Sequence, residues 1–301
     1  MQLAIAQGST MPELRRIHLV RNCAIALLLI ASTGSATGAS RTLERIRADG
    51  VIHLGYRAFA APFSFKDRDG SIRGYSAELC TRVAAAIQKQ LGLAALKVEW
   101  SAVNAADRLD AVSKGKVDIE CGTTTMTLAR YEQVDFSLPT FVEGGSVLTR
   151  ADAKIRELPD FGGKRIAVIA GTTTESALRR ELAAAGARSE LVTVNGPDAG
   201  MALLVSGKVD GYAGDRTVLA SLRARSEDPS KLAMLDSDFS FEPYALVVRR
   251  DDPDFRLAVN RALVEIYRRG DIDDIFYRWL GSLGRPGPLL HSMFYLNTLP
   301  E

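Results

Sequence analysis

The chain has few of the residue types on which most enzyme and metal chemistry depends. It contains three histidines and three cysteines in 301 residues, and beyond residue 39 only His53, His291, Cys80 and Cys121 remain. The two histidines lie far apart in sequence, which argues against a metal cluster, and the two cysteines do not form a C-x-x-C pair. The motifs G-x-S-x-G and H-E-x-x-H and a Walker loop are also absent. The sequence therefore predicts no metal and no cofactor, and it favours a binding protein over an enzyme.

Excess charge is missing as well. The whole chain carries 38 basic and 36 acidic residues, but residues 1–39 hold three of the former and one of the latter. The remainder has 35 of each and is formally neutral. Nucleic-acid binding calls for a basic patch or stripe, so no nucleic-acid partner is expected.

The N-terminus has the pattern of a secretory signal peptide. Arg15, Arg16 and Arg21 precede the apolar run "CAIALLLIA" at 23–31, and a stretch of small residues follows. We expect cleavage near Ala39. An uncleaved anchor is the alternative, but the run is shorter than the roughly 20 residues that span a bilayer. No later run is long enough, so we expect a soluble protein outside the cytoplasm.

The remaining cysteine pair, Cys80 and Cys121, predicts one disulfide. In an oxidising compartment a lone pair of cysteines can form such a bond. Cys80 falls on the apolar side of a helix expected at 76–91, and Cys121 ends a strand expected beside it, so the two sulfur atoms can meet between helix and sheet. Two buried thiols are the alternative.

Two internal repeats organise the chain. Residues 111–125, "AVSKGKVDIECGTTT", resemble 203–217, "LLVSGKVDGYAGDRT", and the alignment on "GKVD" places Thr123 over Asp215. In each copy an apolar helix is expected to end at a glycine, Gly115 or Gly207, where the left-handed conformation costs least. A strand is expected to begin at "KVD".

The second repeat pairs 50–57 with 163–172, each an apolar strand with a polar end, followed by helical patterns at 76–91 and 174–186. Strands that alternate with helices in this way indicate parallel βαβ units. Two copies predict two similar α/β lobes.

Ligands of open α/β sheets bind outside the carboxyl ends of the strands. Arg57, Thr123, Thr172 and Asp215 all fall at such ends, so we expect them to face a cleft between the lobes.

The connections between the lobes are also predicted. The extended run 137–150 is interrupted by Gly144 and Gly145, and a second extended run, 241–253, returns. Two amphipathic helices, expected at 252–270 and 271–283, would then cover the first lobe. The predicted parts are lobe 1 at 40–140 plus 246–301, lobe 2 at 145–240, and hinge crossings at 140–145 and 241–245.

The polar groups at the strand ends suit a zwitterion. Arg130 can form two parallel hydrogen bonds to a carboxylate, and the hydroxyls of Thr123, Thr125 and Thr172 can satisfy its other lone pairs. Asp215 can pair with an ammonium group. The alternative is that Thr172 only caps a helix and that Arg130 is an ordinary surface arginine.

Four stretches of the sequence carry a family resemblance: "GVIHLGYRAFAAPFSFKDRDGSIRGYSAEL", "ECGTTTMTLAR", "GKRIAVIAGTTTESAL" and "VDGYAGDR". They resemble the periplasmic amino-acid-binding proteins of ABC importers, solute-binding protein family 3, and the likeness covers 42–280. Within that family "GYR", "DRLDAV", "ECGTTT" and the tail "GRPGPLLHSMFYLN" look most like the glutamate/aspartate-binding branch. The resemblance implies a two-lobed periplasmic-binding-protein type II fold, a monomer, and membrane permease subunits as partners.

The resemblance also implies residue roles. Arg130 would bind the α-carboxylate of the ligand and Asp215 its α-ammonium, with further hydrogen bonds from Thr125 and Thr172. Arg57 and Arg108 would receive a side-chain carboxylate. Two positions depart from the branch: Ala105 stands where a serine is usual, and a histidine of the second lobe is replaced near Pro197.

The leading hypothesis is a solute-binding protein that captures glutamate or aspartate and delivers it to an ABC permease. Three alternatives stay open at this point. The first is a secreted enzyme of the same fold, similar to a cyclohexadienyl or arogenate dehydratase. The second is a binding protein for another amino acid, and the third is a ligand-sensing partner of a receptor.

Overall fold

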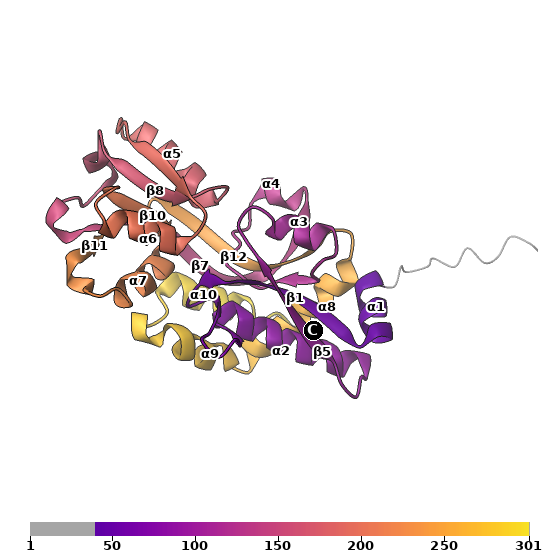
Figure 1. Ribbon diagram of the computed structural model, residues 1–301. Helices are drawn as coiled ribbons and strands as arrows, with labels where there is room; N and C mark the ends of the chain where they lie inside the picture. Colours follow the sequence, from indigo (N-terminus) through magenta and orange to yellow (C-terminus); the bar gives the residue numbers. More distant parts are fainter. Residues whose placement is uncertain (1–39, 301) are drawn as a thin grey trace, which may run out of the picture. The chain divides into compact units, whose positions relative to one another are not determined.

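The computed structural model describes residues 40–300, so the predicted signal peptide lies outside the described residues. This part of the chain is a mixed α/β structure in which helices cover the faces of one large sheet (Figure 1). Within it, none of the helices has both the length and the apolar character needed to cross a membrane.

Nine strands form the main sheet in the spatial order β5-β1-β6-β12-β7-β10-β8-β9, with β11 paired to β7, and β2, β3 and β4 form a small separate sheet. The strands are β1 (Val51–Arg57), β2 (Phe59–Ala60), β3 (Ser64–Lys66), β4 (Ile72–Arg73), β5 (Lys97–Val103), β6 (Ile119–Glu120), β7 (Val134–Arg150), β8 (Arg165–Ile169), β9 (Glu190–Val194), β10 (Gly211–Asp215), β11 (Leu232–Met234) and β12 (Ser240–Arg249).

Ten α-helices are described. The two predicted C-terminal helices, α8 and α9, pack against α2, whereas α1, α7 and α10 are additional to the prediction. The helices are α1 (Arg41–Asp49), α2 (Tyr75–Leu91), α3 (Arg108–Ser113), α4 (Leu128–Tyr131), α5 (Thr173–Ala184), α6 (Pro197–Val205), α7 (Arg216–Ala224), α8 (Pro253–Arg268), α9 (Asp271–Leu280) and α10 (Pro288–Leu296).

The predicted parallel strands are confirmed. β1 pairs in parallel with β5 and β6, and β8 pairs in parallel with β9 and β10. Both glycines after the repeated helices are left-handed, with φ of 69° at Gly115 and 71° at Gly207. The repeat is thus a structural one, in which each copy adds a helix and a parallel strand to its half of the sheet.

Both repeated strands begin later than "KVD". The N–H groups of the lysine and valine of each copy still bond back to the preceding helix, at the carbonyl of Ala111 in the first copy and of Leu203 in the second. The aspartate N–H is the first to bond to a neighbouring strand. Asp118 donates to the carbonyl of His53 in β1, and Asp210 donates to the carbonyl of Arg165 in β8. Since these backbone groups close the helix, they are not available to the sheet.

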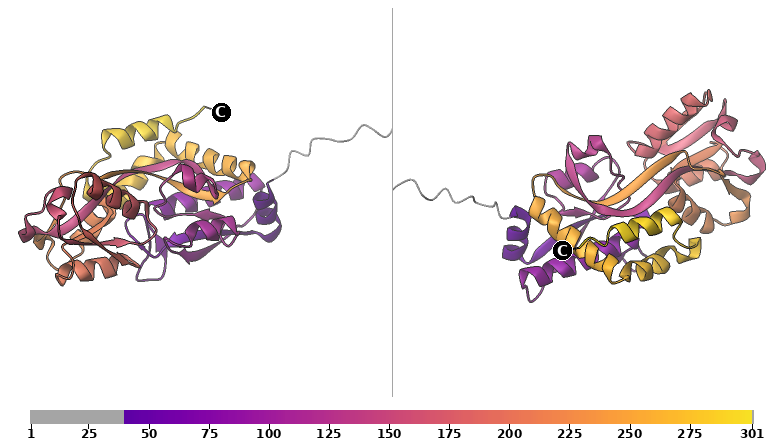
Figure 2. Two further views of the ribbon diagram at one scale, coloured as in Figure 1. Left: turned by 90° about the horizontal axis from the view of Figure 1, so that it is seen from above. Right: turned by 180° about the vertical axis from the view of Figure 1, so that it is seen from behind.

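The connection between the two halves is a pair of long antiparallel strands. The two strands, β7 and β12, run side by side as long ribbons (Figure 2). They are in register from Val134–Arg249 to Gly145–Ser240, with an irregularity around Ala245. β7 runs without a break through Gly144 and Gly145, so the predicted interruption is wrong. The glycines instead allow close approach, because a Cβ on Gly145 would lie 2.5 Å from Ser240 Oγ.

The apolar core follows the same division. The buried members of two clusters come from 46–141 and 244–294, and those of two others come from 147–235. The segments between these groups lie in the β7–β12 region, where the hinge crossings are predicted. Separate cores are what two lobes require, while the lobe boundaries themselves stay a prediction.

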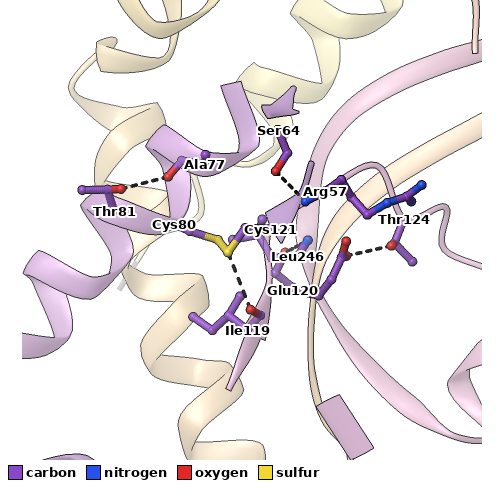
Figure 3. The surroundings of a disulfide bond; sticks show 11 residues. Arg57, Ser64, Ala77, Cys80, Thr81, Ile119, Glu120, Cys121, Thr124 and Leu246 are labelled. Atoms are coloured by element: carbon purple, nitrogen blue, oxygen red, sulfur yellow. Dashed lines mark hydrogen bonds between the residues drawn. A yellow bond between two sulfur atoms is a disulfide. The ribbon is translucent and has the colours of Figure 1, made fainter. Parts of the chain in front are cut away.

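A disulfide joins Cys80 of α2 to Cys121 directly after β6, with their Cα atoms 6.1 Å apart (Figure 3). Both cysteines are fully buried. The predicted bond is confirmed, and it fixes α2 to the end of β6, where the threonine-rich segment begins.

Candidate ligand-binding site

A pocket of about 270 Å³ lies at the carboxyl ends of the parallel strands. One wall comes from β1, α3 and the segment after β6, and the other from β10 and the first turn of α5. Six of the seven predicted ligand-binding residues line this pocket. They are Arg57, Arg108, Thr123, Thr125, Thr172 and Asp215.

Two guanidinium groups, those of Arg57 and Arg108, meet on the first wall. Arg57 ends β1, and burial together with the neighbouring charge of Arg108 lowers the pKa of Arg57 to about 10. Among residues 40–300 no hydrogen bond or ion pair engages the Arg57 guanidinium. Arg108, 3% exposed, donates from Nη1 to the carbonyl of Thr123 at 3.0 Å, while its Nε is buried without a partner.

One carboxylate, that of Glu120, lies beneath this wall. It accepts a hydrogen bond from Thr124 Oγ1 at 2.7 Å, and its other oxygen has no partner. Figure 3 shows Glu120 and the Arg57 side chain extending away from the disulfide. A Cβ on Gly122 would overlap both Glu120 and Arg57, so a glycine is needed for their approach. The charge of Glu120 offsets part of the lowering of the Arg57 pKa, more than the charge of Asp215 does.

Arg130 does not belong to the pocket lining. It lies in α4, whose N-terminus is capped by Thr127, and its Nη1 donates to the carbonyl of Thr125 at 2.7 Å. Burial, then the charge of Arg108, lowers the pKa of Arg130 to about 10. The side chain is half-buried, unlike an ordinary surface arginine. Arg108 and Arg130 thus each hold the carbonyl of a threonine that lines the pocket.

Thr172 and Thr173 have different roles at the start of α5. The Thr172 hydroxyl accepts from the N–H of Glu175 at 3.1 Å and donates to the carbonyl of Ile169 at 2.8 Å. It is therefore the helix cap of the alternative interpretation, although it also lines the pocket. Thr173, which was not among the predicted site residues, donates to Glu242 Oε2 at 2.7 Å, and its Oγ1 lies 3.1 Å from Thr125 Oγ1.

Asp215 ends β10 and lines the second wall. It accepts a hydrogen bond from Thr174 Oγ1 at 3.2 Å. Burial raises the pKa of its carboxyl group, with a smaller contribution from the charge of Glu242. Asp215 has no salt bridge among the residues that the structure describes, so it is available to a cationic group in the pocket.

Two buried glutamates were missed from the sequence. Glu143 of β7 and Glu242 of β12 are directly opposite each other in the antiparallel register, and they are 7% and 2% exposed. Burial, then the charge of Asp215, raises the pKa of Glu143 to about 8. A glutamate within an otherwise apolar extended run was the available signal, because such residues are rarely buried without a partner.

No metal site is found in the described part of the chain, where no group of three or more possible ligands is present. Neither histidine lines the pocket; His53 approaches Glu99 at the surface, 3.4 Å away. The pocket offers guanidinium groups, hydroxyls and a carboxylate, which together can bind a small molecule with charges of both signs.

Comparison with known proteins agrees with this architecture. An L-glutamate/L-aspartate-binding protein of Pseudomonas aeruginosa is 32% identical over 257 residues, covering 85% of each chain. A glutamate/aspartate import solute-binding protein of Salmonella typhimurium is 29% identical over 244 residues, covering 81% of each.

Among solved structures, the ancestral amino-acid-binding protein AncCDT-1, a precursor of cyclohexadienyl dehydratase, has a TM-score of 0.69 at 27% identity and covers 80% of this chain and 99% of its own. Such neighbours confirm the predicted two-lobed α/β fold. The model of the bacterial extracellular solute-binding proteins, family 3, matches residues 52–282. The chain belongs to that family.

Proposed function

We propose that this protein captures an acidic L-amino acid, glutamate or aspartate, and delivers it to the permease subunits of an ABC importer. It would act as a monomer in the periplasm, after removal of residues 1–39. The observation that carries the acidic specificity is the pair of guanidinium groups, Arg57 and Arg108, on one wall of the pocket.

The two arginines retain unused donors. Arg57 makes no side-chain hydrogen bond within the described residues, and the Nε of Arg108 is buried without a partner. A buried donor left unpaired costs about 1–3 kcal/mol. A carboxylate on the ligand side chain would satisfy these donors and provide the second negative charge that Glu120 alone does not supply.

Ligands with other side chains fit the wall formed by Arg57 and Arg108 less well. A lysine or arginine ligand would place a third cation beside two guanidinium groups, which like-charge repulsion opposes. A glutamine ligand would provide one acceptor oxygen but no charge. The two relatives named above support the same choice, since both are named for glutamate and aspartate.

The opposite wall suits the backbone of an amino acid. Asp215 would pair with the α-ammonium group, and Thr125 lies across from it on the first wall. Arg130 would reach the α-carboxylate only after a movement of its side chain or of the ligand, because it does not line the pocket. Asn104 and Asn195 also line the pocket, close to the predicted departures Ala105 and Pro197, and provide amide groups for the ligand.

The test is a comparison of Arg57→Met with wild type by calorimetry. Arg57 is a better position for this test than Arg108, because the Arg57 guanidinium makes no internal hydrogen bond that the substitution would break. We expect wild type to prefer glutamate or aspartate over glutamine. Arg57→Met should weaken glutamate about 10- to 100-fold and change glutamine by less than about threefold. Arg68→Met, at an exposed turn, is the matched control. A wild type that prefers glutamine, or a variant with full glutamate affinity, would overturn the acidic specificity.

An enzyme is the second candidate, favoured by the likeness to a precursor of cyclohexadienyl dehydratase and by two carboxyl groups whose pKa values are raised, Asp215 and Glu143. Incubation of the pure protein with amino acids and prephenate-like acids, followed by mass spectrometry, separates the two. Binding without product supports the transport function, and turnover would replace it.

A further inference from the structure

Glu242 connects the two walls of the pocket. Its Oε2 accepts hydrogen bonds from Thr125 Oγ1 at 2.6 Å and from Thr173 Oγ1 at 2.7 Å. Thr125 follows β6 on the first wall, and Thr173 begins α5 on the second. The other oxygen, Oε1, accepts from Ser240 Oγ at 2.8 Å. The Glu242 carboxyl group, which comes from β12, therefore links the segment after β6 to the start of α5, and these two segments belong to opposite walls of the pocket.

The surroundings of Glu242 determine which way the hydroxyl protons point. The residue is 2% exposed, and no cation lies within salt-bridge distance of its carboxyl group in residues 40–300. Glu242 Oε2 accepts from both threonine hydroxyls, and each hydroxyl has a single proton with two lone pairs. The protons of Thr125 and Thr173 are therefore both directed at Glu242.

The lone pairs of the two hydroxyls are then left for the pocket. Thr125 and Thr173 line it, whereas Glu242 does not. A hydroxyl that has already donated its proton can only accept from a ligand. This arrangement favours a donor, such as the ammonium group of an amino acid, and disfavours a second carboxylate at the same place.

We propose that Glu242 is a positioning residue for ligand binding: it holds the Thr125 and Thr173 hydroxyls together across the pocket and turns them into acceptors for the ligand ammonium group. The inference rests on the proposed binding of an amino acid, but it does not depend on an acidic side chain. It assigns both hydroxyls to the ammonium group, whereas the sequence predicts the Thr125 hydroxyl as a partner of the carboxylate and makes no prediction for Thr173.

A change of Glu242 should therefore alter selectivity as well as affinity. In Glu242→Gln the shape is retained, but the amide nitrogen is a donor and the charge is gone, so at least one hydroxyl can turn its proton toward the pocket. Binding of glutamate should weaken about 10- to 100-fold. Glutarate, which has the same two carboxylates and no ammonium group, should lose much less.

The experiment measures glutamate and glutarate affinities by calorimetry for wild type, Glu242→Gln and Thr173→Val. The ratio of the glutarate dissociation constant to the glutamate dissociation constant should fall at least about fivefold in both variants. The double variant should fall little further, because Glu242 and Thr173 act through the same contact. Ser240→Ala is the matched control: it removes a donor to the same carboxylate that does not line the pocket, and the ratio should change by less than about twofold.

A purely structural role for Glu242 would weaken both ligands equally and leave the ratio unchanged, which would overturn the inference. If the wild type selects glutamine instead, the acidic specificity fails, but the same ratio taken with glutamine and its des-amino analogue still tests Glu242. A wild type that binds no amino acid would overturn both proposals.

Discussion

Arg108 is bonded through its side chain to the main chain of Thr123: Nη1 donates to the Thr123 carbonyl at 3.0 Å, and both residues line the pocket. The arginine thereby holds the threonine-rich segment that follows β6, while its Nε is buried without a partner. Its contribution to binding cannot be separated from its contribution to the fold, in contrast to Arg57, whose guanidinium has no such contact in the described residues.

Arg108→Met should accordingly have two effects. Glutamate affinity should fall about 10- to 100-fold, and the free energy of unfolding should fall by about 1–3 kcal/mol because the buried Thr123 carbonyl loses its partner. Calorimetry and urea denaturation measure the two quantities. Arg57→Met, the comparison variant, should show the first effect with little of the second, and equal losses of stability in both variants would contradict the assignment.

Asp215→Asn should weaken every amino-acid ligand, acidic or neutral, since the proposed contact is with the common ammonium group. We expect a loss of about 10- to 100-fold, measured by calorimetry with glutamate and glutamine. Asp198→Asn is the control, because Asp198 is exposed in the first turn of α6. Retained affinity in Asp215→Asn would remove Asp215 from the binding site.

Loss of the disulfide should lower the free energy of unfolding without changing the pocket. Cys80 and Cys121 are 41 residues apart, and the chain-entropy model gives about 4 kcal/mol for a loop of this length. Urea denaturation of Cys80→Ala/Cys121→Ala measures the change. Addition of a reductant should destabilise wild type but not the double variant; an unchanged wild type would indicate two free thiols.

Stability should depend on the proton of Glu143. Its carboxylate accepts from the N–H groups of Gly144 at 3.0 Å and Thr217 at 3.3 Å, yet burial and the charge of Asp215 raise its pKa from 4.5 to about 8. Between these two values the folded state binds a proton that the unfolded state has released. The free energy of unfolding should therefore decrease as the pH rises from about 4.5 to about 8 and then level off.

Denaturation of Glu143→Gln at pH 5, 6.5 and 8 tests this dependence. The variant cannot titrate at this position, so its stability relative to wild type should increase with pH over this range. Each unit of pKa difference corresponds to about 1.4 kcal/mol. A pH-independent difference between the two proteins would show that the Glu143 carboxyl is not protonated in the folded state.

Ligand should close the protein about the β7–β12 pair. Asp215 and Arg57 stand on different walls, so a molecule that contacts both favours the conformation in which the walls are nearest. Solution scattering with saturating glutamate should show a smaller radius of gyration than the ligand-free protein. An unchanged radius with a tightly bound ligand would contradict the closure about the predicted crossings.

The sequence by itself determined which segments form the repeated units. A left-handed glycine after each helix, an apolar strand and a polar end are local features, and local backbone preferences decide them. From these features the positions of Arg57, Thr123 and Asp215 at strand ends follow, because parallel strands of one sheet end on the same side. The disulfide followed as well, since a helix beside a strand brings Cys80 and Cys121 together.

Only the tertiary structure decided how the side chains of distant segments meet. Thr125 is 48 residues from Thr173 and 117 from Glu242, and no local pattern relates the three. The register of β7 with β12 sets Glu143 opposite Glu242, and a shift of one residue would turn each side chain to the other face. At the start of α5, the capping bond of Thr172 leaves Thr173 to reach across the pocket. Such choices depend on which donors and acceptors are buried together, and that is a property of the assembled sheet rather than of any one segment.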